Sequence, residues 1–250
     1  AQARLSTGYP LPVVDSGEAS GNITFKTGAV AGHSGTEAYA LTSTKSGVTI
    51  TANAAHGFFN ATQTLRQLLP GFINSKYPVY AAWEVPAVEI KDSPRYSYRA
   101  IMLDPARSFL TVDEVKHVID QMASLKMSYL HFHLADDQGW RIEITNEGRS
   151  EGDTIDYTRL TGVSGGTAMN MHDKAKSNEV GRTGYYTQAQ YKEIVAYAAA
   201  RHITLVPEID LPGHTNAALH AIPQLNTAGS SHQAGKSASE TTVGSKTRTS

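Results

Sequence analysis

The sequence of 250 residues contains no cysteine, which excludes disulfide bonds, thiol catalysis and cysteine-ligated zinc. Its 22 lysine and arginine residues nearly balance 23 aspartate and glutamate residues, and they are scattered rather than clustered. Binding to nucleic acid or to a membrane surface is therefore not expected. No apolar run approaches the length of a transmembrane helix. The chain is long enough for one large domain or two modest ones with substantial cores.

The N-terminus and the composition bear on where the protein works. Ala1-Gln2-Ala3-Arg4 is not a signal peptide, although a mature secreted protein whose signal has been removed could start in this way. The chain is rich in Ala, Gly, Ser and Thr and poor in Lys, a style that suits an exported bacterial enzyme. We therefore expect a secreted, extracellular protein.

Residues 1–94 are predicted to form a small α+β domain without a catalytic role. Residues 37–42 and 48–52 alternate apolar and polar side chains, as half-buried strands do, and a Ser-Gly turn joins them. Apolar residues then recur at helical spacing over residues 57–69, and Pro70-Gly71 ends that helix. This region offers little chemistry, so we expect it to be scaffold.

Residues 95–250 follow a different pattern, in which apolar strands alternate with amphipathic helices. The predicted elements are three strands separated by two helices, at residues 98–104, 111–125, 127–134, 187–199 and 203–210. Each strand is followed by polar residues, an order typical of parallel βα units. The sequence therefore predicts an α/β fold that contains the first three βα units of a (β/α)8 TIM barrel. The active site of such a barrel lies at the C-terminal strand ends.

The predicted barrel is incomplete. Three strands cannot close a barrel, and residues 227–250 are mostly Gly, Ser, Thr and Ala, with Val243 as the lone large apolar side chain. Such a segment cannot bury enough apolar surface to order itself. We therefore expect a second polypeptide, or a C-terminal half outside this sequence, to complete the barrel, with the junction after Thr227.

Polar residues follow two of the predicted strands. Asp136 and Asp137 come after the second strand, and His214 comes after the third. Because adjacent strand residues point to opposite sides, one Asp of the pair should face the site, and the alternative for such a carboxylate is to cap a loop. A carboxylate bonded to one imidazole nitrogen fixes the tautomer and aims the other nitrogen at a catalytic group. We therefore predict that Asp136 and His214 are catalytic and lie within hydrogen-bonding distance of each other.

Arg99 and a pair of histidines lie inside the predicted strands. A guanidinium buried in a strand must be paired or functional, and its five fixed donors suit sugar hydroxyls, so Arg99 is the candidate substrate-binding residue. His131 and His133 share one strand face, as ligands in a metal-dependent hydrolase could. No carboxylate or histidine stands nearby at obvious ligand spacing, which favours core histidines bonded to backbone and no metal.

Three longer motifs contain these residues. They are Tyr-Arg-Ala-Ile-Met-Leu-Asp-Pro-Ala-Arg at 98–107, Leu-His-Phe-His-Leu-Ala-Asp-Asp-Gln-Gly-Trp-Arg at 130–141 and Val-Pro-Glu-Ile-Asp-Leu-Pro-Gly-His-Thr-Asn at 206–216. Together they resemble successive motifs of family 20 glycoside hydrolases, in the style of the bacterial β-N-acetylhexosaminidases. The helix predicted at 57–69 is similar to one in the small domain that precedes the barrel in that family. The resemblance covers roughly residues 35–225 in order, and the combination is specific although each motif alone is weak.

The resemblance implies hydrolysis of terminal non-reducing N-acetyl-β-D-hexosamine residues, at the ends of chitooligosaccharides or glycans, by a retaining mechanism. The 2-acetamido carbonyl attacks the anomeric carbon and forms an oxazolinium-type intermediate. An Asp orients the acetamido group while a Glu protonates the leaving oxygen. The resemblance also implies that Arg99 holds sugar hydroxyls and that Asp136 and His214 form a relay to the Glu. It implies no cofactor.

The sequence departs from the family pattern in three ways. The Asp-Glu pair of a Gly-Gly-Asp-Glu motif is absent. The aromatic residues that wall the acetamido pocket belong to the absent half. Pro105 and Ser108 stand where the family usually has an apolar residue and a histidine. We therefore expect this chain alone to be inactive.

Two alternative functions remain open from the sequence. One is a non-catalytic chain that binds carbohydrate or serves as scaffold, because this half could hold a sugar without cleaving it. The other is a metal-dependent barrel hydrolase that uses His131 and His133. Inhibition by a strong chelator and recovery with zinc would favour the second alternative.

Overall fold

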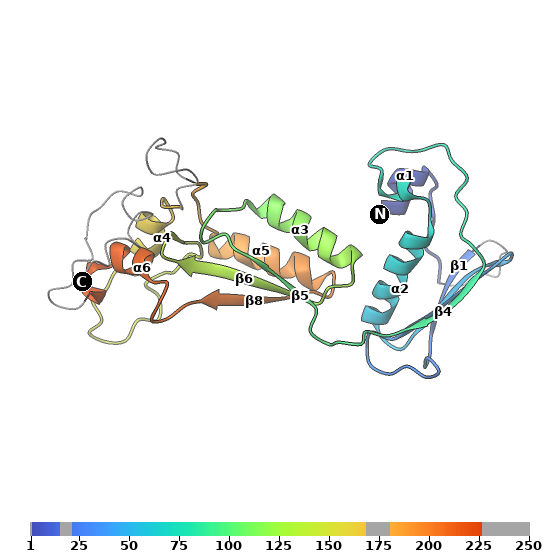
Figure 1. Cartoon of the computed structure of the whole chain (residues 1–250), viewed down its shortest axis with the longest axis horizontal. Helices are drawn as coiled ribbons and strands as arrows, with labels where there is room; N and C mark the ends of the chain where they lie inside the picture. The colour runs from blue at the N-terminus through green and yellow to red at the C-terminus, as the bar shows by residue number, and fades with distance from the viewer. Residues whose placement is uncertain (1, 16–21, 169–180, 227–250) are drawn as a thin grey trace. The chain divides into compact units, whose positions relative to one another are not determined.

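The computed structural model describes residues 2–15, 22–168 and 181–226, and the chain divides into two compact units. The first unit consists of Ala1–Ser97 with Ala123–Lys126, and the second of Tyr98–Met122 with the chain from Met127 onward. Each unit has a sheet and helices of its own (Figure 1). Among the described helices, none is long and apolar enough to cross a membrane.

The first unit is built on a mixed four-stranded sheet with the strand order β1-β3-β2-β4. The strands are β1 (Asn22–Thr27), β2 (Tyr39–Thr44), β3 (Gly47–Ala52) and β4 (Val88–Asp92). β1 runs parallel to β3, whereas the β2–β3 and β2–β4 pairs are antiparallel. The helices are α1 (Gln2–Thr7), α2 (Ala55–Leu68) and the short 3-10 helix η1 (Gly71–Asn74).

One face of this sheet packs against α2. Alternate residues of β2 and β3 are buried together with Ala61 and Leu65 of the helix. A Cβ atom at Gly57 would overlap the carbonyl oxygen of Ala38, so glycine is required for this close approach of helix and strand. The two strands and the helix predicted for this region are present, and β1 and β4 extend the sheet at its edges.

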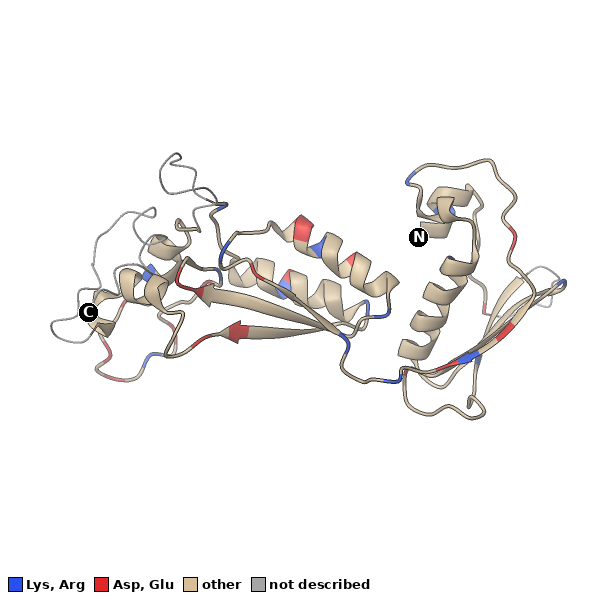
Figure 2. Cartoon of the chain, in the orientation of Figure 1, with Lys and Arg blue, Asp and Glu red and all other residues tan. Residues whose placement is uncertain are grey.

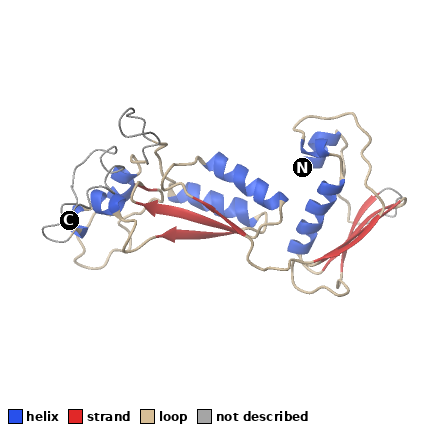
Figure 3. Cartoon of the chain, in the orientation of Figure 1, coloured by secondary structure: helices blue, strands red, loops and turns tan. Residues whose placement is uncertain are grey.

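The second unit contains three parallel strands, β5 (Ala100–Leu103), β6 (Tyr129–Asp136) and β8 (Thr204–Ile209), with β6 in the middle. The two-residue strand β7 (Gly139–Trp140) turns back antiparallel to the end of β6. α3 (Val112–Ser124) connects β5 to β6, α5 (Gln188–Ala199) precedes β8, and both lie on the same side of the sheet (Figure 1, Figure 3). The shorter helices are α4 (Arg159–Ser164), α6 (Asn216–Ala221) and η2 (Pro223–Leu225). The strands and the two longer helices follow the predicted order.

Both longer helices begin at a capping box. At the start of α3, Thr111 N donates to Glu114 Oε2 over 2.8 Å and Glu114 N donates to Thr111 Oγ1 over 3.3 Å. Thr187 forms the same kind of box at the start of α5. Ile119 of α3 and Ile194 of α5 are fully buried on the apolar stripes that follow. Local sequence signals therefore determine where these two helices begin and which face they bury.

β5 and β8 are the edge strands of this sheet within the described residues, each paired with β6. Side chains on both strands are partly exposed, including Met102 at 52% and Ile209 at 43%. Parallel strands are normally buried on both faces. The open sheet therefore agrees with the first part of a barrel. The expectations for residues 227–250 lie outside the described residues.

Candidate active site

Charged side chains gather where the parallel strands of the second unit end. Asp104 follows β5, Asp136 is the last residue of β6, and His214 lies shortly after β8. Figure 2 shows acidic segments in red at the ends of β6 and β8. The C-terminal ends of neighbouring parallel strands meet at one edge of a sheet, which is where barrel enzymes keep their active sites.

Asp136 is enclosed by hydrogen-bond donors, and its side chain is 1% exposed. Its Oδ2 lies 2.9 Å from His133 Nε2 and 2.5 Å from Arg107 Nη2, and its Oδ1 accepts from the backbone N–H of Asp137 over 2.5 Å. Burial raises the pKa of Asp136, but the bonds from His133 and Asp137 and the charge of Arg107 outweigh burial and hold the pKa below its usual value. Asp136 is therefore an ionised carboxylate at neutral pH.

His214 is held against Asp136, as the sequence predicts. Its Nδ1 lies 3.2 Å from Asp136 Oδ1, and its side chain is 53% exposed. Its φ angle of 56° lies in the left-handed region, where a non-glycine residue carries backbone strain of a kind that clusters at functional sites. The bond to Nδ1 fixes the ring, so that Nε2 can meet a further group. The predicted contact is confirmed, and the catalytic role of the pair stays a prediction.

Asp137 lies beside Asp136 and makes a contact of its own. Its Oδ1 accepts a hydrogen bond from the backbone N–H of Asn216 over 3.1 Å, at the start of α6. This contact satisfies one of the backbone donors that a helix leaves unpaired at its first turn. Asp136 is therefore bonded within the site and Asp137 caps a helix beside it, so the two carboxylates have different partners although they lie close together.

Arg99 does not lie at this edge of the sheet. It directly precedes β5, and its backbone is bonded to Ser128 at the start of β6. Ser128 N donates to the Arg99 carbonyl over 2.8 Å, and Arg99 N donates to Ser128 Oγ over 3.2 Å. Because β5 and β6 are parallel, these contacts place Arg99 at the edge opposite to Asp136. Its side chain is only half-buried, so the argument from the cost of a buried charge does not apply, and the geometry does not support Arg99 as a sugar-binding residue.

Arg107 is the arginine that the structure brings into the site. Its Nη1 lies 2.5 Å from Asp104 Oδ2, its Nη2 lies 2.5 Å from Asp136 Oδ2, and its side chain is 35% exposed. Its backbone N–H donates to Asp104 Oδ1 over 3.0 Å. Burial lowers the pKa of Arg107, but the bond to Asp104 and the charge of Asp136 outweigh burial and raise it. The sequence signal for Arg107 was its place just after a strand, which is the same signal that identified Asp136.

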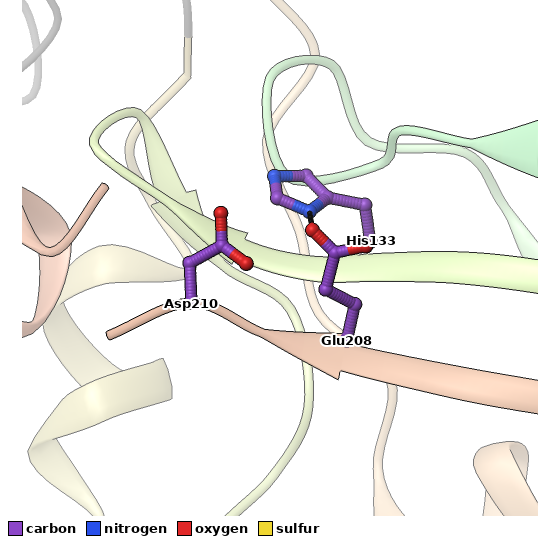
Figure 4. A group of neighbouring side chains, drawn as sticks. All are labelled: His133, Glu208 and Asp210. Carbon is purple, nitrogen blue, oxygen red and sulfur yellow. Dashed lines mark hydrogen bonds and ion pairs between the residues drawn. The ribbon is translucent and has the colours of Figure 1, made fainter. Parts of the chain in front are cut away.

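His131 and His133 are bonded to carboxylates, so the expectation of backbone partners was wrong. His133 Nε2 lies 2.9 Å from Asp136 Oδ2, and His133 Nδ1 lies 2.8 Å from Glu208 Oε1. His131 Nε2 contacts the other carboxylate oxygen of Glu208. Figure 4 shows His133 and Glu208 pointing toward each other from β6 and β8. The sequence could not reveal this contact because Glu208 lies on another strand, 75 residues from His133 along the chain.

These contacts favour the protonated form of His133. The bond to Asp136 raises the pKa of His133, burial opposes it, and the bond to Glu208 adds to the rise, which brings the pKa to about 9. An imidazolium donates from both ring nitrogens, as two carboxylate partners require. His133 is thus a buried cation between two anions.

Both units of the chain match models of one protein family. Residues 96–249 match the model described as glycosyl hydrolase family 20, catalytic domain, and residues 1–93 match domain 2 of the same family. The chain belongs to glycosyl hydrolase family 20. It is 46% identical over 189 residues to a beta-hexosaminidase of Porphyromonas gingivalis and 39% identical over 195 residues to a beta-N-acetylhexosaminidase of Cellulomonas fimi. These matches cover 76% and 78% of this chain, but 22% and 34% of the two relatives.

Solved structures of family 20 enzymes share this fold. The N-acetyl-beta-hexosaminidase of Streptomyces plicatus, in complex with Thio-NAglucal, matches with a TM-score of 0.79 at 45% identity. That match covers 91% of this chain and 41% of the Streptomyces plicatus chain. The second unit of this family 20 chain is therefore part of a TIM barrel, as predicted. The chain spans about a fifth to two fifths of the length of these relatives.

Among the described residues of this family 20 chain, two groups of side chains bring metal-ligand atoms close together. They are His133 with Glu208 and Asp210 (Figure 4), and Asp136 with Asp137 and His214. A histidine ligand must offer a lone pair, whereas a protonated His133 donates from both nitrogens. The first group therefore favours an ion-pair network over a metal centre, and the match to family 20 does not favour the metal-dependent hydrolase.

Proposed function

We propose that the protein to which this chain belongs hydrolyses terminal non-reducing N-acetyl-β-D-hexosamine residues, with retention and with the acetamido group of the substrate as nucleophile. Relatives at 46%, 39% and 35% identity are a beta-hexosaminidase, a beta-N-acetylhexosaminidase and an N,N'-diacetylchitobiase. The observation that carries the proposal is the Asp136–His214 hydrogen bond at the C-terminal strand ends of a family 20 barrel. The rest of the protein, or a second polypeptide, supplies the acid Glu and the Asp that orients the acetamido group.

In this mechanism, Asp136 and His214 act through the acid Glu. The ionised Asp136 holds His214 by Nδ1, and the half-exposed imidazole can bond the Glu carboxyl by Nε2. Such an imidazole stabilises the Glu carboxyl as it gives its proton to the leaving oxygen and as it later takes a proton from water. Asp136 and His214 are positioning residues in this scheme, because the Glu is the group that contacts the substrate.

Arg107 is the residue that we assign to sugar binding, in place of Arg99. Asp104 and Asp136 hold two nitrogens of its guanidinium at the strand ends, and part of the side chain remains exposed. A planar guanidinium with five N–H donors can bond two hydroxyl oxygens at once, which a lysine cannot do with the same geometry. The restraint by two carboxylates also reduces the entropy that Arg107 loses on binding a sugar.

The full-length protein tests the proposed activity directly. It should hydrolyse a chromogenic N-acetyl-β-glucosaminide. The matched β-glucoside lacks the intramolecular nucleophile and should react at least roughly a hundredfold more slowly. The first anomer released, observed by proton NMR, should be the β form. Equal turnover of the two glycosides, or release of the α form, would refute the mechanism. Inhibition by a chelator with recovery in zinc would support the metal-dependent hydrolase instead.

The relay can be tested in the same protein with Asp136→Asn and His214→Gln. Residues that act as one unit lose their function together, so the double variant should cost little more in kcat than the worse single variant. Steady-state kinetics of the three variants measures this. If the losses in kcat of the two single variants simply add in the double variant, Asp136 and His214 act independently and the relay is refuted.

A further inference from the structure

Arg141 directly follows β7, and its fully buried side chain donates hydrogen bonds to backbone carbonyl groups. A guanidinium has five N–H groups, and each of the five donates here to a different carbonyl oxygen. The acceptors are Pro105 (2.8 Å, from Nε), Gly165 and Gly184 (3.1 and 3.0 Å, from Nη1), and Ala106 and Thr167 (2.8 and 2.7 Å, from Nη2). Every hydrogen-bond donor of this side chain is therefore satisfied by the main chain of its own unit.

The charge of Arg141 persists although the side chain is buried. Burial lowers the pKa of Arg141 to about 10, so the guanidinium is still protonated at neutral pH. A buried charge is tolerated where polar groups replace the water that it has lost, and five carbonyl dipoles do so here. Lysine offers three donors without a planar fork and cannot make the same set of bonds.

Two of the five carbonyls belong to the turn directly before Arg107. The Arg141 guanidinium bonds the carbonyls of Pro105 and Ala106, and the Ala106 N–H donates to the His133 carbonyl of β6 over 3.3 Å. Ala106 is fully buried between these partners. The backbone that leads into Arg107 is thus bonded to Arg141 through its carbonyls and to β6 through its amide.

The chain around Arg141 is shaped for this guanidinium. A Cβ atom at Gly139 would overlap the Arg141 guanidinium, so a glycine there leaves the space that the side chain fills. The backbone of Arg141 is also fixed, because its N–H donates to the Leu134 carbonyl over 2.8 Å and its carbonyl accepts from Tyr186 N over 2.7 Å. The need for a glycine at position 139 is therefore an observation in addition to the five side-chain hydrogen bonds.

We propose that Arg141 is a positioning residue for sugar binding, which holds the turn at residues 105–106 so that the Arg107 guanidinium stays against Asp136. The inference rests on the role proposed above for Arg107. Without Arg141, the carbonyls of the turn lose their partners and the Arg107 guanidinium leaves its place. The hydrogen bond between Asp136 and His214 does not involve this turn and remains. The loss therefore falls on sugar binding.

Kinetics of the full-length enzyme gives the first test. Arg141→Lys should lower kcat/KM for a chromogenic N-acetyl-β-glucosaminide by roughly tenfold or more, chiefly through KM. Arg149→Lys is the matched control, because Arg149 is exposed in the same connection between β7 and α5 and donates to one carbonyl, that of Ile155, over 2.7 Å. Its kinetics should not change. Free guanidinium ion should restore part of the activity of Arg141→Ala and should leave the activity of Arg149→Ala unchanged.

A double variant separates positioning of Arg107 from a general structural role. If Arg141 acts through Arg107, then Arg141→Lys should cost less than about threefold in kcat/KM when Arg107→Lys is already present. If Arg141 has only a general structural role, Arg141→Lys should lower kcat/KM by the same factor in the wild type and in Arg107→Lys. Additive losses in this cycle overturn the proposal.

Hydrogen exchange tests the same inference without any activity. In Arg141→Lys, the amides of Ala106 and Arg107 should exchange roughly tenfold faster or more, and amides of α2 in the first unit should not change. If the wild-type enzyme fails to cleave N-acetylhexosaminides, the proposed function is refuted, and the exchange rates still decide whether Arg141 holds the turn. Unchanged exchange at Ala106 overturns the inference. If Arg141→Lys does not fold, Gly139→Ala replaces it in the kinetic and the hydrogen-exchange experiments. This variant displaces the guanidinium without removing it.

Discussion

At the residue scale, Arg107 and Arg99 form a matched pair at opposite ends of β5. Arg107→Lys keeps the charge but loses the planar fork, so kcat/KM of the full-length enzyme should fall at least tenfold, on the order of 1.4 kcal/mol. Arg99→Lys should change neither kinetic constant by more than about twofold, because Arg99 lies at the edge opposite to Asp136. Steady-state kinetics on a chromogenic N-acetyl-β-glucosaminide measures both. A loss confined to Arg99→Lys would return sugar binding to Arg99.

His133 gives stability a pH dependence of known sign. Its pKa rises from 6.5 to about 9 on folding, chiefly through Asp136. The stabilisation is therefore fully present below about pH 6.5 and is lost as the pH rises through about 9, with an upper limit of about 3 kcal/mol. The Tm of the full-length protein should fall over this range. The difference in Tm between wild type and His133→Gln should narrow over the same range.

The exposed His117 of α3 provides the control for this effect. His117→Gln should change the Tm little, because the side chain is exposed. Differential scanning calorimetry at several pH values measures both differences. If the difference in Tm between the wild type and His133→Gln stays constant with pH, the imidazole of His133 is neutral between its two carboxylates.

At the element scale, the predictable parts of the fold are those with local signals. β6 alternates leucine and phenylalanine with histidine, and α3 and α5 begin at capping boxes, so each could be recognised within a short window. β1 alternates Ile23 and Phe25 with polar residues over only six residues, its side chains are mostly exposed, and its place in the sheet depends on pairing with β3. The six-residue helices α4 and α6 are too short to form alone and depend on packing against a small buried cluster that includes Leu160 and Ile222.

In the candidate site too, the residues with a local sequence signal could be predicted and the contacts between distant residues could not. Asp136 ends β6 and His214 lies shortly after β8, and their contact follows from the parallel arrangement of those strands. The sequence argument treated Arg99 as buried and close to the site, whereas the structure places it half-buried near the start of β5. The partnership of His133 with Glu208 depends on the register between β6 and β8, which no local pattern encodes.

The cap of α5 gives a prediction at this scale. Thr187 Oγ1 accepts from Gln190 N over 3.2 Å, and the Gln190 side chain accepts from Thr187 N over 2.9 Å. Thr187→Ala removes one partner of this box and should lower the free energy of unfolding by about 1 kcal/mol, with no change in kinetics. Thr154→Ala, at an exposed residue outside the helices, should have no effect on stability. Denaturant titration of the full-length protein measures both. Equal stability of Thr187→Ala and wild type would show that the box contributes nothing.

At the scale of the whole molecule, the chain contains one part of a larger barrel. β5 and β8 pair with β6 on one side each, and the described residues provide no strand for their outer edges. Unpaired edges of a parallel sheet are open to non-specific association. The solved Streptomyces plicatus enzyme is more than twice as long as the part that this chain matches, since the match covers 41% of it. We expect the remaining strands of the barrel, and the acid Glu of the proposed mechanism, to come from outside the described residues.

Residues 1–250 alone should therefore be inactive and should show no cooperative melt of the second unit. The edges of β5 and β8 lack partners within the described residues, and side chains such as Met102 would face water. Co-expression with the C-terminal half should restore both activity and a single melting transition, because the missing strands close the sheet. The two pieces should then copurify through a core-like interface and separate only on denaturation. Assay of a chromogenic N-acetyl-β-glucosaminide beside a thermal melt measures both properties. Turnover by residues 1–250 alone, together with a cooperative transition, would place an acid catalyst among these residues and would contradict the half-barrel interpretation.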